Sequence, residues 1–465
     1  MRDLTRLIKA YDVRGLVPDD LDESLARDIG AAFVSVVGAA GRDGGPGAVV
    51  IGHDMRPSGP PLVSAFADGV RSQGCDVIEI GLCSTDGLYF ASGQLGLPGA
   101  MFTASHNPAQ YNGIKMCRVG AAPVGQDTGL NEIRALLETH PGGIAPVDVS
   151  TGSLTHRDLL GDYGAFLRGL VDLSGLRPLH VVVDAGNGMA GLTVPAVLGG
   201  LPLTIEPLYF ELDGTFPNHE ANPIDAANMR DLQAKVIEVG ADVGLAFDGD
   251  ADRCFVVDEA GAIVDPSTLT AMIAVRELAK HPGSAIIHNL ITSTAVPELV
   301  REHGGTPIQT RVGHSFIKAE MASTGAVFGG EHSGHFYFRD FWNADSGMLA
   351  ALHVLAALGE TPAGTTLSSL LAQYSRYVSS GEINSTVSAP TAVLDSLRTH
   401  YDNRPGIELS ELDGLTVSGD SWWFNVRPSN TEPLLRLNVE GNDEATMVRV
   451  RDEALGLIRA GQVGE

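Results

Sequence analysis

The sequence predicts a multidomain α/β protein in which one architecture occurs three times and a smaller α+β domain ends the chain. Three stretches share a short run rich in β-branched residues that opens onto a polar or glycine-rich turn: AVVIGHDMRPSG from residue 48, HVVVDAGNGMAG from 180 and AIIHNLITSTA from 285. This pattern is typical of a strand followed by a helix-capping loop. Helical and strand-like stretches then alternate, which indicates βαβ units with mostly parallel sheets.

Each of these three units reaches a second polar loop after a later strand. The loops read TASHNP from residue 103, FDGDADR from 247 and GGEHSGH from 329, at offsets of 55, 67 and 44 residues from the starts of their units. Open α/β sheets place their ligand sites at the carboxyl ends of strands. We therefore expect ligand-binding loops that could all face one cleft.

The last part of the chain follows a different pattern. From about residue 381 we expect a strand, a helix, two strands and a final helix, with RPSNTEP between two strand-like stretches. Joints rich in Gly, Pro, Ser or Thr separate the predicted domains. We place these domains at residues 1–150, 151–260, 261–372 and 373–465.

Composition narrows the class of protein. Of the 465 residues, 44% are hydrophobic and 19% are charged, so the chain can bury several cores and is not disordered. A net charge of -26 argues against a protein that coats nucleic acid. Four cysteines without a CxxC pair indicate reduced thiols of a cytoplasmic protein, and we expect neither a signal peptide nor a membrane segment. A large soluble enzyme is the broad expectation.

The loop FDGDADR is a candidate metal site. Asp248, Asp250 and Asp252 alternate in it, which brings together three carboxylates of the kind that a divalent cation such as Mg²⁺ requires. The alternative is a turn whose aspartates bind backbone amides. An EF-hand calcium loop is rejected, because Arg253 occupies the position of its glycine and the following CFVVDE is strand-like.

Ser105 lies in TASHNP, where a constrained loop could present its hydroxyl as a nucleophile or phosphate carrier beside His106. The alternative is an ordinary turn, since Ser and Asn before Pro are common turn residues. The loop RPSNTEP offers a dense set of donors that suits a phosphate group, although a plain β-turn is again the alternative. Its donors are Arg427, Ser429, Asn430 and Thr431.

The loop GGEHSGH combines a carboxylate that could accept bonds from sugar hydroxyls with imidazoles that could move protons. Its polar residues are Glu331, His332, Ser333 and His335. DAGNGMAG contains Gly186, Gly188 and Gly191, a formal GxGxxG after a strand, which would suggest dinucleotide binding. A dehydrogenase is disfavoured, because it would leave the aspartate triplet and the phosphate-binding loop unexplained.

Taken together and in this order, KAYDVRG, TASHNP, NGIK, DGDADR, GEHSGH and RPSNTEP resemble the α-D-phosphohexomutase superfamily, specifically its phosphomannomutase/phosphoglucomutase branch. The resemblance covers nearly the whole chain. It implies three related α/β domains and a TATA-box-protein-like final domain around a central cleft. It also implies a mutase that interconverts hexose 1-phosphate and hexose 6-phosphate, of mannose and also of glucose. The reaction would use a phosphoserine and hexose 1,6-bisphosphate as intermediate and activator.

The resemblance further implies roles for individual residues. Ser105 would be the phosphoserine, and one of its phosphate oxygens would hold Mg²⁺ with Asp248, Asp250 and Asp252. Arg253 would neutralise the phosphoryl group, Lys115 or His335 would transfer a proton, and His106 is counted with these catalytic residues. Those expected to bind the phosphosugar are Tyr11, Arg14, His314, Lys318, Glu331, Ser333, Arg427, Ser429, Asn430 and Thr431.

One position departs from the family pattern. Thr294 stands where related mutases often carry Arg, so that contact is in doubt and Thr294 is not counted as a site residue. A phosphoglucosamine mutase is the alternative within the family. A noncatalytic sugar-phosphate-binding protein is the alternative outside catalysis, and the intact Ser105 and aspartate triplet argue against it.

Overall fold

The computed structural model describes residues 3–39, 47–148, 150–428 and 434–460, together with the side chains of nearly all of them. The chain forms mixed α/β structure and divides into two compact units. The first unit contains Met1–Pro266 and Ser333–Leu370, and the second contains Ser267–His332 and Leu371–Glu465. Among the residues described, no helix combines the length and the apolar character that crossing a bilayer takes.

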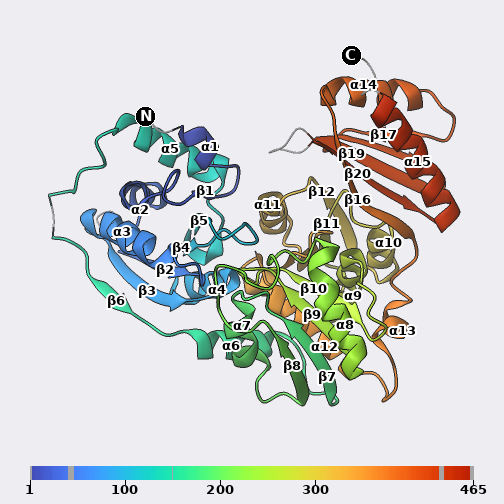
Figure 1. Cartoon of the computed structure of the whole chain (residues 1–465), viewed down its shortest axis with the longest axis horizontal. Coiled ribbons are helices and arrows are strands. Elements are labelled where there is room, and N and C mark those ends of the chain that lie inside the picture. Colours follow the sequence, from blue (N-terminus) through green and yellow to red (C-terminus); the bar gives the residue numbers. More distant parts are fainter. Residues whose placement is uncertain (1–2, 40–46, 149, 429–433, 461–465) are drawn as a thin grey trace. The chain divides into compact units, whose positions relative to one another are not determined.

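The first sheet has the strand order β1-β5-β4-β2-β3-β6 and carries the first of the repeated patterns (Figure 1). Strand β2 lies parallel to β3 and β4, whereas β5 runs antiparallel to both β4 and β1. The strands are β1 (Val13–Leu16), β2 (Ala48–His53), β3 (Asp76–Leu82), β4 (Gly99–Phe102), β5 (Tyr111–Cys117) and β6 (Leu154–His156). The expected parallel core is confirmed, but the sheet is mixed at the edge that carries TASHNP.

Helices cover this sheet and start where the sequence provides caps. Asp22 accepts a hydrogen bond from Leu25 N at the start of α2, and Gly38 ends that helix in the left-handed conformation at φ 65°. The helices are α1 (Leu4–Leu7), α2 (Glu23–Val37), α3 (Gly59–Ser72), α4 (Thr85–Leu95) and α5 (Leu130–Thr139). Phe66 on α3 contacts Phe102 edge to face, with ring centroids 5.3 Å apart, so this helix packs directly on the strand that precedes Ser105.

The second sheet has the order β10-β9-β7-β8. Strand β7 (Leu179–Asp184) lies parallel to β8 (Leu203–Leu208) and β9 (Val243–Phe247), and β10 (Cys254–Asp258) runs antiparallel to β9. Its helices are α6 (Leu160–Leu170), α7 (Ala190–Leu198) and α8 (Arg230–Val239). The aspartate triplet therefore lies in the turn of an antiparallel β9–β10 pair, at the carboxyl end of β9.

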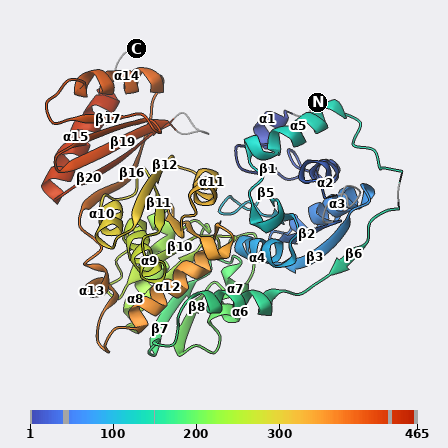
Figure 2. The ribbon, with the colours of Figure 1, turned by 180° about the vertical axis from the view of Figure 1, so that it is seen from behind.

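The first unit also contains a segment that comes much later in the sequence. Strands β14 (Phe336–Phe338) and β15 (Ala344–Asp345) pair antiparallel and are followed by α12 (Gly347–Gly359). Trp342 stacks on Phe166 of α6, with centroids 5.1 Å apart, and meets Phe90 of α4 at 6.4 Å. These rings tie the late segment to α4 and to α6. In the view from behind, α12 of this segment lies beside β10 (Figure 2).

In the second unit, the third repeated pattern forms β11 (Ala285–Asn289), which lies parallel to β12 (Thr306–Thr310) and to β13 (Phe328–Gly330). The helices of this part are α9 (Pro266–Lys280), α10 (Ala295–Glu302) and α11 (His314–Thr324). All five residues of β11 are buried or half-buried, which explains why the strand starts with the apolar run AII rather than with an alternating pattern. The two glycines of GGEHSGH end β13, so the rest of this loop also lies at the carboxyl end of a strand, as predicted.

The C-terminal part has an antiparallel sheet of order β16-β20-β19-β18-β17. Its strands are β16 (Val378–Thr386), β17 (Glu408–Ser410), β18 (Leu415–Gly419), β19 (Trp422–Pro428) and β20 (Leu434–Gly441), and α14 (Pro390–Tyr401) and α15 (Glu444–Ala460) cover it. The α+β class and the place of RPSNTEP between two strands are confirmed. The expectation of three strands was wrong, because β17 is very short and two residues separate β18 from β19, so their pattern looks like one run.

Candidate active site

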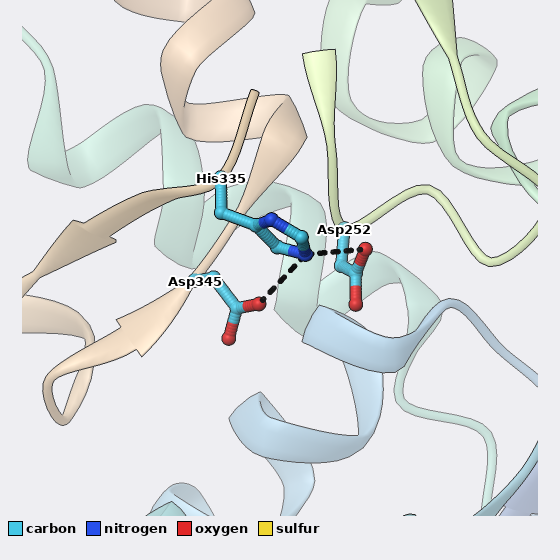
Figure 3. Close-up of side chains that lie close together, drawn as sticks. All are labelled: Asp252, His335 and Asp345. Atoms are coloured by element: carbon cyan, nitrogen blue, oxygen red, sulfur yellow. Dashed lines mark ion pairs between the residues drawn. The ribbon is translucent and has the colours of Figure 1, made fainter. Parts of the chain in front are cut away.

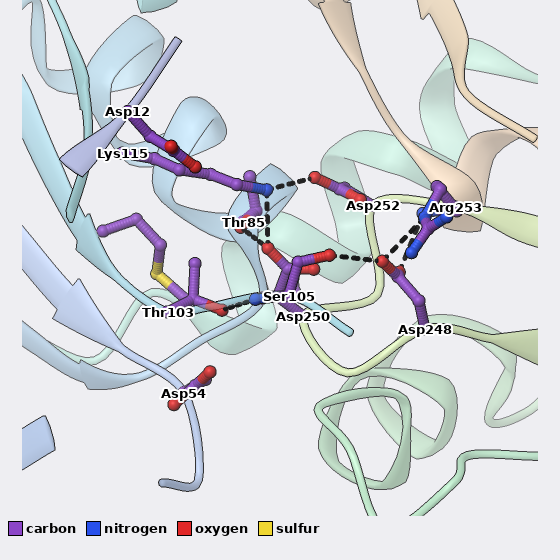
Figure 4. A network of polar contacts seen from close by, with 12 residues as sticks. Asp12, Asp54, Thr85, Thr103, Ser105, Lys115, Asp248, Asp250, Asp252 and Arg253 are labelled. Carbon is purple, nitrogen blue, oxygen red and sulfur yellow. Dashed lines mark hydrogen bonds and ion pairs between the residues drawn. The ribbon is translucent and has the colours of Figure 1, made fainter. Parts of the chain in front are cut away.

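Ser105 occupies a constrained position between β4 and β5. Its backbone φ is 49°, in the left-handed region that non-glycine residues rarely adopt, and its amide donates to Thr103 Oγ1 at 2.9 Å. The side chain is buried, and its Oγ donates to Asp248 Oδ2 at 2.8 Å (Figure 4). The loop TASHNP thus presents its hydroxyl to the aspartate triplet, which is more than an ordinary turn requires.

The three aspartates form a compact and buried set of oxygen ligands. Asp248, Asp250 and Asp252 each offer a carboxylate oxygen, and these atoms lie within 4.8 Å of one another. Oδ1 of Asp250 and Oδ1 of Asp252 are buried and accept no hydrogen bond from the part of the chain that the structure describes. Buried carboxylate oxygens without donors are costly unless a cation coordinates them. The set therefore fits a hard divalent cation.

The residues after the triplet exclude a calcium-binding EF-hand, as the sequence indicated. Cys254–Asp258 forms strand β10 rather than a helix. Glu259, which would be the last ligand of such a loop, instead accepts hydrogen bonds from the backbone and the hydroxyl of Ser368.

Lys115 supplies a positive charge to the cluster from strand β5. Its Nζ donates to Asp250 Oδ2 and to Asp252 Oδ2, both at 2.7 Å. Burial opposes the charged form, but the two carboxylates raise the pKa of Lys115 well above its ordinary value. The same contact lowers the pKa of Asp250, although burial acts in the opposite direction. Lys115 therefore stays protonated and serves as a charge partner in this arrangement.

Arg253 and His106 meet at the other side of Ser105. Arg253 Nε donates to Asp248 Oδ2 at 2.8 Å, and its Nη2 lies 2.7 Å from His106 Nδ1. Burial lowers the pKa of His106 well below its ordinary value, and the charge of Arg253 adds to this effect. His106 is therefore a neutral imidazole whose Nδ1 accepts from the guanidinium, and Ser105 Oγ lies 3.1 Å from the same nitrogen.

His335 approaches the cluster from the segment that precedes β14. Its Nε2 lies 3.7 Å from Asp252 Oδ1 and 3.9 Å from Asp345 Oδ2, between the two carboxylates (Figure 3). Ser333 Oγ lies 3.0 Å from the other ring nitrogen. A backbone bridge between Arg253 and His335 fixes this approach. Two residues of GGEHSGH thus join the site of the first unit.

Two further side chains reach this cluster without having been named from the sequence. Thr85 Oγ1 donates to Asp250 Oδ2 at 2.6 Å, and Asp345 faces His335. The sequence signals of these two residues were weak. Thr85 has the context of the first residue of a capped helix, and Asp345 is an isolated acidic residue before another helix start. No local pattern indicated that either residue would reach the loop FDGDADR, called the metal loop below.

Arg14 and Tyr11 belong to the start of the chain. Arg14 in β1 donates to Asn107 Oδ1 at 2.7 Å, so it contacts the loop that carries Ser105, and it also pairs with Asp12. Tyr11 lies just before β1 and is half-buried. Their expected role in binding substrate stays a prediction.

The remaining predicted residues lie in the second unit. Glu331 is buried, and its Oε1 accepts from Asn289 Nδ2 and from the amide of Gly313, both at 3.2 Å. Lys318 is buried on α11, and His314 is the first residue of that helix, with its side chain outside the described part. Arg427 lies near the end of β19 and donates to Glu382 Oε2 at 3.1 Å. Ser429, Asn430 and Thr431 lie outside the described residues.

Thr294, the departure from the family pattern, directly precedes α10. Its amide donates to Glu440 Oε1 at 3.0 Å, and the indole of Trp423 donates to the same oxygen at 2.7 Å. The backbone of Thr294 is thus attached to the C-terminal sheet, and this contact does not use its side chain.

Comparison with known proteins covers nearly the whole chain. Four family models described as phosphoglucomutase/phosphomannomutase match it: alpha/beta/alpha domain I at residues 5–141, domain II at 163–261, domain III at 265–377 and the C-terminal domain at 382–457. A "Phosphohexose mutases" protein of Xanthomonas campestris is 42% identical over 457 residues, which cover 97% of this chain and 99% of that protein.

A second relative and a solved structure agree with this match. The "Phosphomannomutase/phosphoglucomutase" of Pseudomonas syringae is 38% identical over 96% of this chain and 93% of its own. The crystal structure of a phosphoglucomutase/phosphomannomutase family protein from Burkholderia thailandensis superposes with a TM-score of 0.87 at 34% identity, covering 98% of both chains.

Proposed function

We propose that this phosphosugar mutase, a member of the α-D-phosphohexomutase superfamily, interconverts the 1-phosphates and 6-phosphates of mannose and of glucose. The observation that carries this proposal is the Ser105 hydroxyl, held 2.8 Å from Asp248 beside a buried set of three carboxylates. A relative whose name joins phosphomannomutase and phosphoglucomutase supports the breadth of substrate.

The metal ligands we propose are Asp248, Asp250, Asp252 and an oxygen on Ser105. Their oxygens are the hard ligands that Mg²⁺ prefers. When bound, Mg²⁺ would withdraw negative charge from a phosphoryl group on Ser105 and so ease its transfer. Arg253 is placed to add a second positive charge, because its guanidinium already contacts the carboxylate that Ser105 contacts.

In the first half-reaction, a hydroxyl oxygen of the sugar phosphate forms a bond to phosphorus while the bond from phosphorus to Ser105 Oγ breaks. The hydroxyl proton must pass to a base, and Ser105 Oγ must gain a proton as it leaves phosphorus, so that the number of protons is unchanged. Lys115 stays protonated between two carboxylates, whereas an imidazole can accept a proton near neutral pH. We therefore assign this proton to His335 Nε2, which lies between Asp252 and Asp345, while Ser333 contacts the other ring nitrogen.

The product of that step is a hexose 1,6-bisphosphate, and the second half-reaction returns its other phosphoryl group to Ser105. One phosphoserine can serve both sugar positions only if the bisphosphate reverses its orientation between the two transfers. In this proposal Glu331 and Ser333 bind sugar hydroxyls, with Tyr11, Arg14, His314 and Lys318 as further substrate contacts. The phosphate that does not react is bound by Arg427, Ser429, Asn430 and Thr431. We further propose that four domains, at residues 1–150, 151–260, 261–372 and 373–465, supply one loop each.

Parallel assays with the 1-phosphates of mannose, glucose and glucosamine test the substrate class. Each assay contains Mg²⁺ and hexose 1,6-bisphosphate as activator. We expect turnover of the mannose and glucose compounds, because they differ in configuration at C2 alone. Turnover of glucosamine 1-phosphate alone would favour the phosphoglucosamine mutase, and binding without any turnover would favour a sugar-phosphate-binding protein.

Peptide mass spectrometry tests the role of Ser105. We expect exchangeable phosphate on this residue, increased by hexose 1,6-bisphosphate and decreased by monophosphate substrate. Ser105→Ala should abolish turnover because it removes the covalent carrier, while Ser429→Ala should mainly raise KM by removing one of several phosphate donors. Phosphate on another residue, or near-normal turnover of Ser105→Ala, contradicts this role.

A further inference from the structure

Arg56 is a buried cation that belongs to none of the site motifs. It follows β2 in the turn HDMRPSG, and 1% of its surface is exposed. Each of its five guanidinium N–H groups has an acceptor. Nε donates to Asp54 Oδ2 at 3.2 Å, Nη1 donates to two backbone carbonyls at 2.9 Å, and Nη2 donates to two more at 2.9 and 2.7 Å. Because all five N–H donors of the guanidinium have acceptors, Arg56 holds several backbone groups in a fixed arrangement.

All four carbonyls lie around the turn that presents Ser105. They belong to Ser105, Asn107, Pro108 and Tyr111. Ser105 itself has φ 49°, a conformation that is unfavourable for a residue with a side chain unless surrounding contacts fix it. Arg56 provides such contacts on the carbonyl side of Ser105.

Asp54 holds Arg56 in place, and Thr103 contacts the amide side of Ser105. The Asp54 carboxylate accepts from the amide of Arg56 at 2.9 Å and from Arg56 Nε at 3.2 Å. Thr103 Oγ1 in turn accepts from the Ser105 amide at 2.9 Å (Figure 4). The backbone of Ser105 is therefore held on its amide side by Thr103 and on its carbonyl side by Arg56, which Asp54 holds in turn.

The far face of the guanidinium is also covered. The ring of Phe216, from the loop after β8, lies 5.2 Å from the guanidinium carbon. A side chain at Gly214 would come within 2.6 Å of the Arg56 backbone, so this loop must pass close to it. Arg56 is thus enclosed by the loop it orders, by its partner Asp54 and by the second domain of the unit.

We propose that Asp54 and Arg56 are positioning residues that fix the carbonyl side of Ser105, while Thr103 fixes its amide side, so that Oγ faces Asp248. The inference rests on the proposed role of Ser105 as phosphate carrier. Neither residue touches the reacting atoms. They act through the loop, where a misplacement of the nucleophile by about 1 Å can cost on the order of 100-fold in rate.

The test compares Arg56→Lys with Arg118→Lys. Lysine keeps the charge of Arg56 but has three donors on a single nitrogen, so it cannot reach four carbonyls and Asp54 together. Arg118 is the matched control, because its guanidinium also donates to two backbone carbonyls of the first domain, those of Val36 and Thr128. For each variant we would measure folding by circular dichroism, kcat and KM, and the rate at which hexose 1,6-bisphosphate phosphorylates Ser105.

For Arg56→Lys we expect about a 100-fold lower kcat and an equally slower phosphorylation of Ser105, with KM within about threefold of wild type. Arg118→Lys should keep kcat and the phosphorylation rate within about threefold. A folded Arg56→Lys protein with wild-type phosphorylation and kcat overturns the proposal, and so does a loss confined to KM. If phosphate is found on another residue in the wild-type protein, it is the role of Ser105 that fails.

Thr103→Val provides an independent test if Arg56→Lys does not fold. Valine fills the buried position of Thr103 but cannot accept the hydrogen bond from the Ser105 amide. A kcat lowered at least about tenfold at unchanged KM supports the proposal. An unchanged kcat overturns it.

Discussion

The charges around Ser105 are balanced residue by residue. Three carboxylates, Asp248, Asp250 and Asp252, face two cations, Lys115 and Arg253, so that the cluster carries one net negative charge. A bound divalent cation would turn this into one net positive charge, which suits a phosphoryl group in a buried place. The cluster therefore needs each of its five charges.

The substitution Asp250→Asn tests this balance, because it removes one negative charge and keeps the shape of the side chain. Asp250 accepts from both Lys115 and Thr85, and an amide oxygen is a weaker ligand and acceptor than a carboxylate. We expect Mg²⁺ binding to weaken by at least about tenfold and turnover to fall with it. A magnesium titration of activity measures both effects.

Asp395→Asn is the control for this change. It makes the same substitution at an exposed aspartate on α14, which pairs with Arg398. Its magnesium titration should match that of the wild type. An equally unchanged titration for Asp250→Asn would mean that the triplet only shapes a turn.

At the scale of elements, one buried carboxyl joins three helices. Asp86 on α4 accepts hydrogen bonds from Ser84, from Tyr163 of α6 at 2.8 Å and from Ser346 at 2.6 Å. Ser84 and Ser346 are also the N-caps of α4 and α12. The start of α4 contacts the metal loop through Thr85, and α12 follows Asp345, so these hydrogen bonds hold together two elements that border the site.

Asp86 should make stability depend on pH. Burial raises its pKa from the ordinary 3.8 to about 6, and the three hydroxyls oppose this shift. The folded protein thus binds this proton more tightly than the unfolded chain does. The resulting stabilisation is fully present below pH 3.8 and is lost as the pH rises through about 6.

Comparison with Asp86→Asn, which cannot titrate, isolates this contribution. Between pH 4 and pH 7 the free energy of unfolding of the wild type should decrease by up to about 3 kcal/mol relative to the variant. Urea unfolding across this range provides the measurement, and Asp395→Asn should run parallel to the wild type. Parallel profiles for wild type and Asp86→Asn would show that Asp86 titrates normally.

Two glycines of DAGNGMAG allow neighbouring backbone segments to approach closely. A Cβ on Gly188 would lie 2.7 Å from the carbonyl oxygen of Gly249 in the metal loop, and one on Gly191 would lie 2.1 Å from that of Phe210. The amide of Met189 donates to the same Gly249 carbonyl at 2.9 Å. The formal GxGxxG is therefore explained by the approach of two backbones, without a dinucleotide.

Gly188→Ala should displace the metal loop. We expect a loss of about 1 to 3 kcal/mol in stability, as for overpacking, together with a higher magnesium requirement for turnover. Gly169→Ala on α6 is the control, since no atom lies within 4 Å of its added Cβ. That variant should gain up to about 1 kcal/mol and keep the wild-type magnesium titration. Thermal unfolding and activity assays would distinguish the two, and identical behaviour would contradict the packing role.

At the scale of the whole molecule, the net charge of -26 repels an anionic phosphosugar. The cations of the first unit's site, Lys115 and Arg253, are buried among carboxylates, and Arg427 is paired with Glu382 in the C-terminal sheet. Binding of the substrate must therefore depend on local donors at short range rather than on the overall field.

The C-terminal sheet has a core of its own, formed by its strands and by α14 and α15. Leu397, Phe424, Leu437 and Val450 are among its buried residues. Because this part is well above the ~40 residues below which small domains rarely fold alone, we expect residues 372–465 to fold as an isolated fragment. Circular dichroism and cooperative thermal unfolding would show this. The same fragment with Leu437→Asp should be unfolded, and a wild-type fragment without cooperative unfolding would contradict the expectation.

The sequence by itself determined the repeated α/β pattern and the loops that carry the candidate site. β-Branched runs, turn residues and alternating aspartates act over a few neighbouring positions, so they can be recognised without knowing the rest of the fold. Ser105 and the aspartate triplet were found in this way. The antiparallel direction of β5 and β10 was not, because each pairs with the strand just before it without a helical crossover, and β5 also joins the distant β1. Short β17 gave too little pattern to detect.

Tertiary structure alone decided which residues meet around these loops. Thr85 reaches Asp250 across 165 positions of sequence, Lys115 reaches it across 135, and Arg56 binds the carbonyl of Ser105 across 49. None of these contacts leaves a local signature, because a hydroxyl, an ammonium or a guanidinium in a loop has the same sequence context whether it faces solvent or a carboxylate. Strand order and burial bring these groups together, and both are properties of the packed chain.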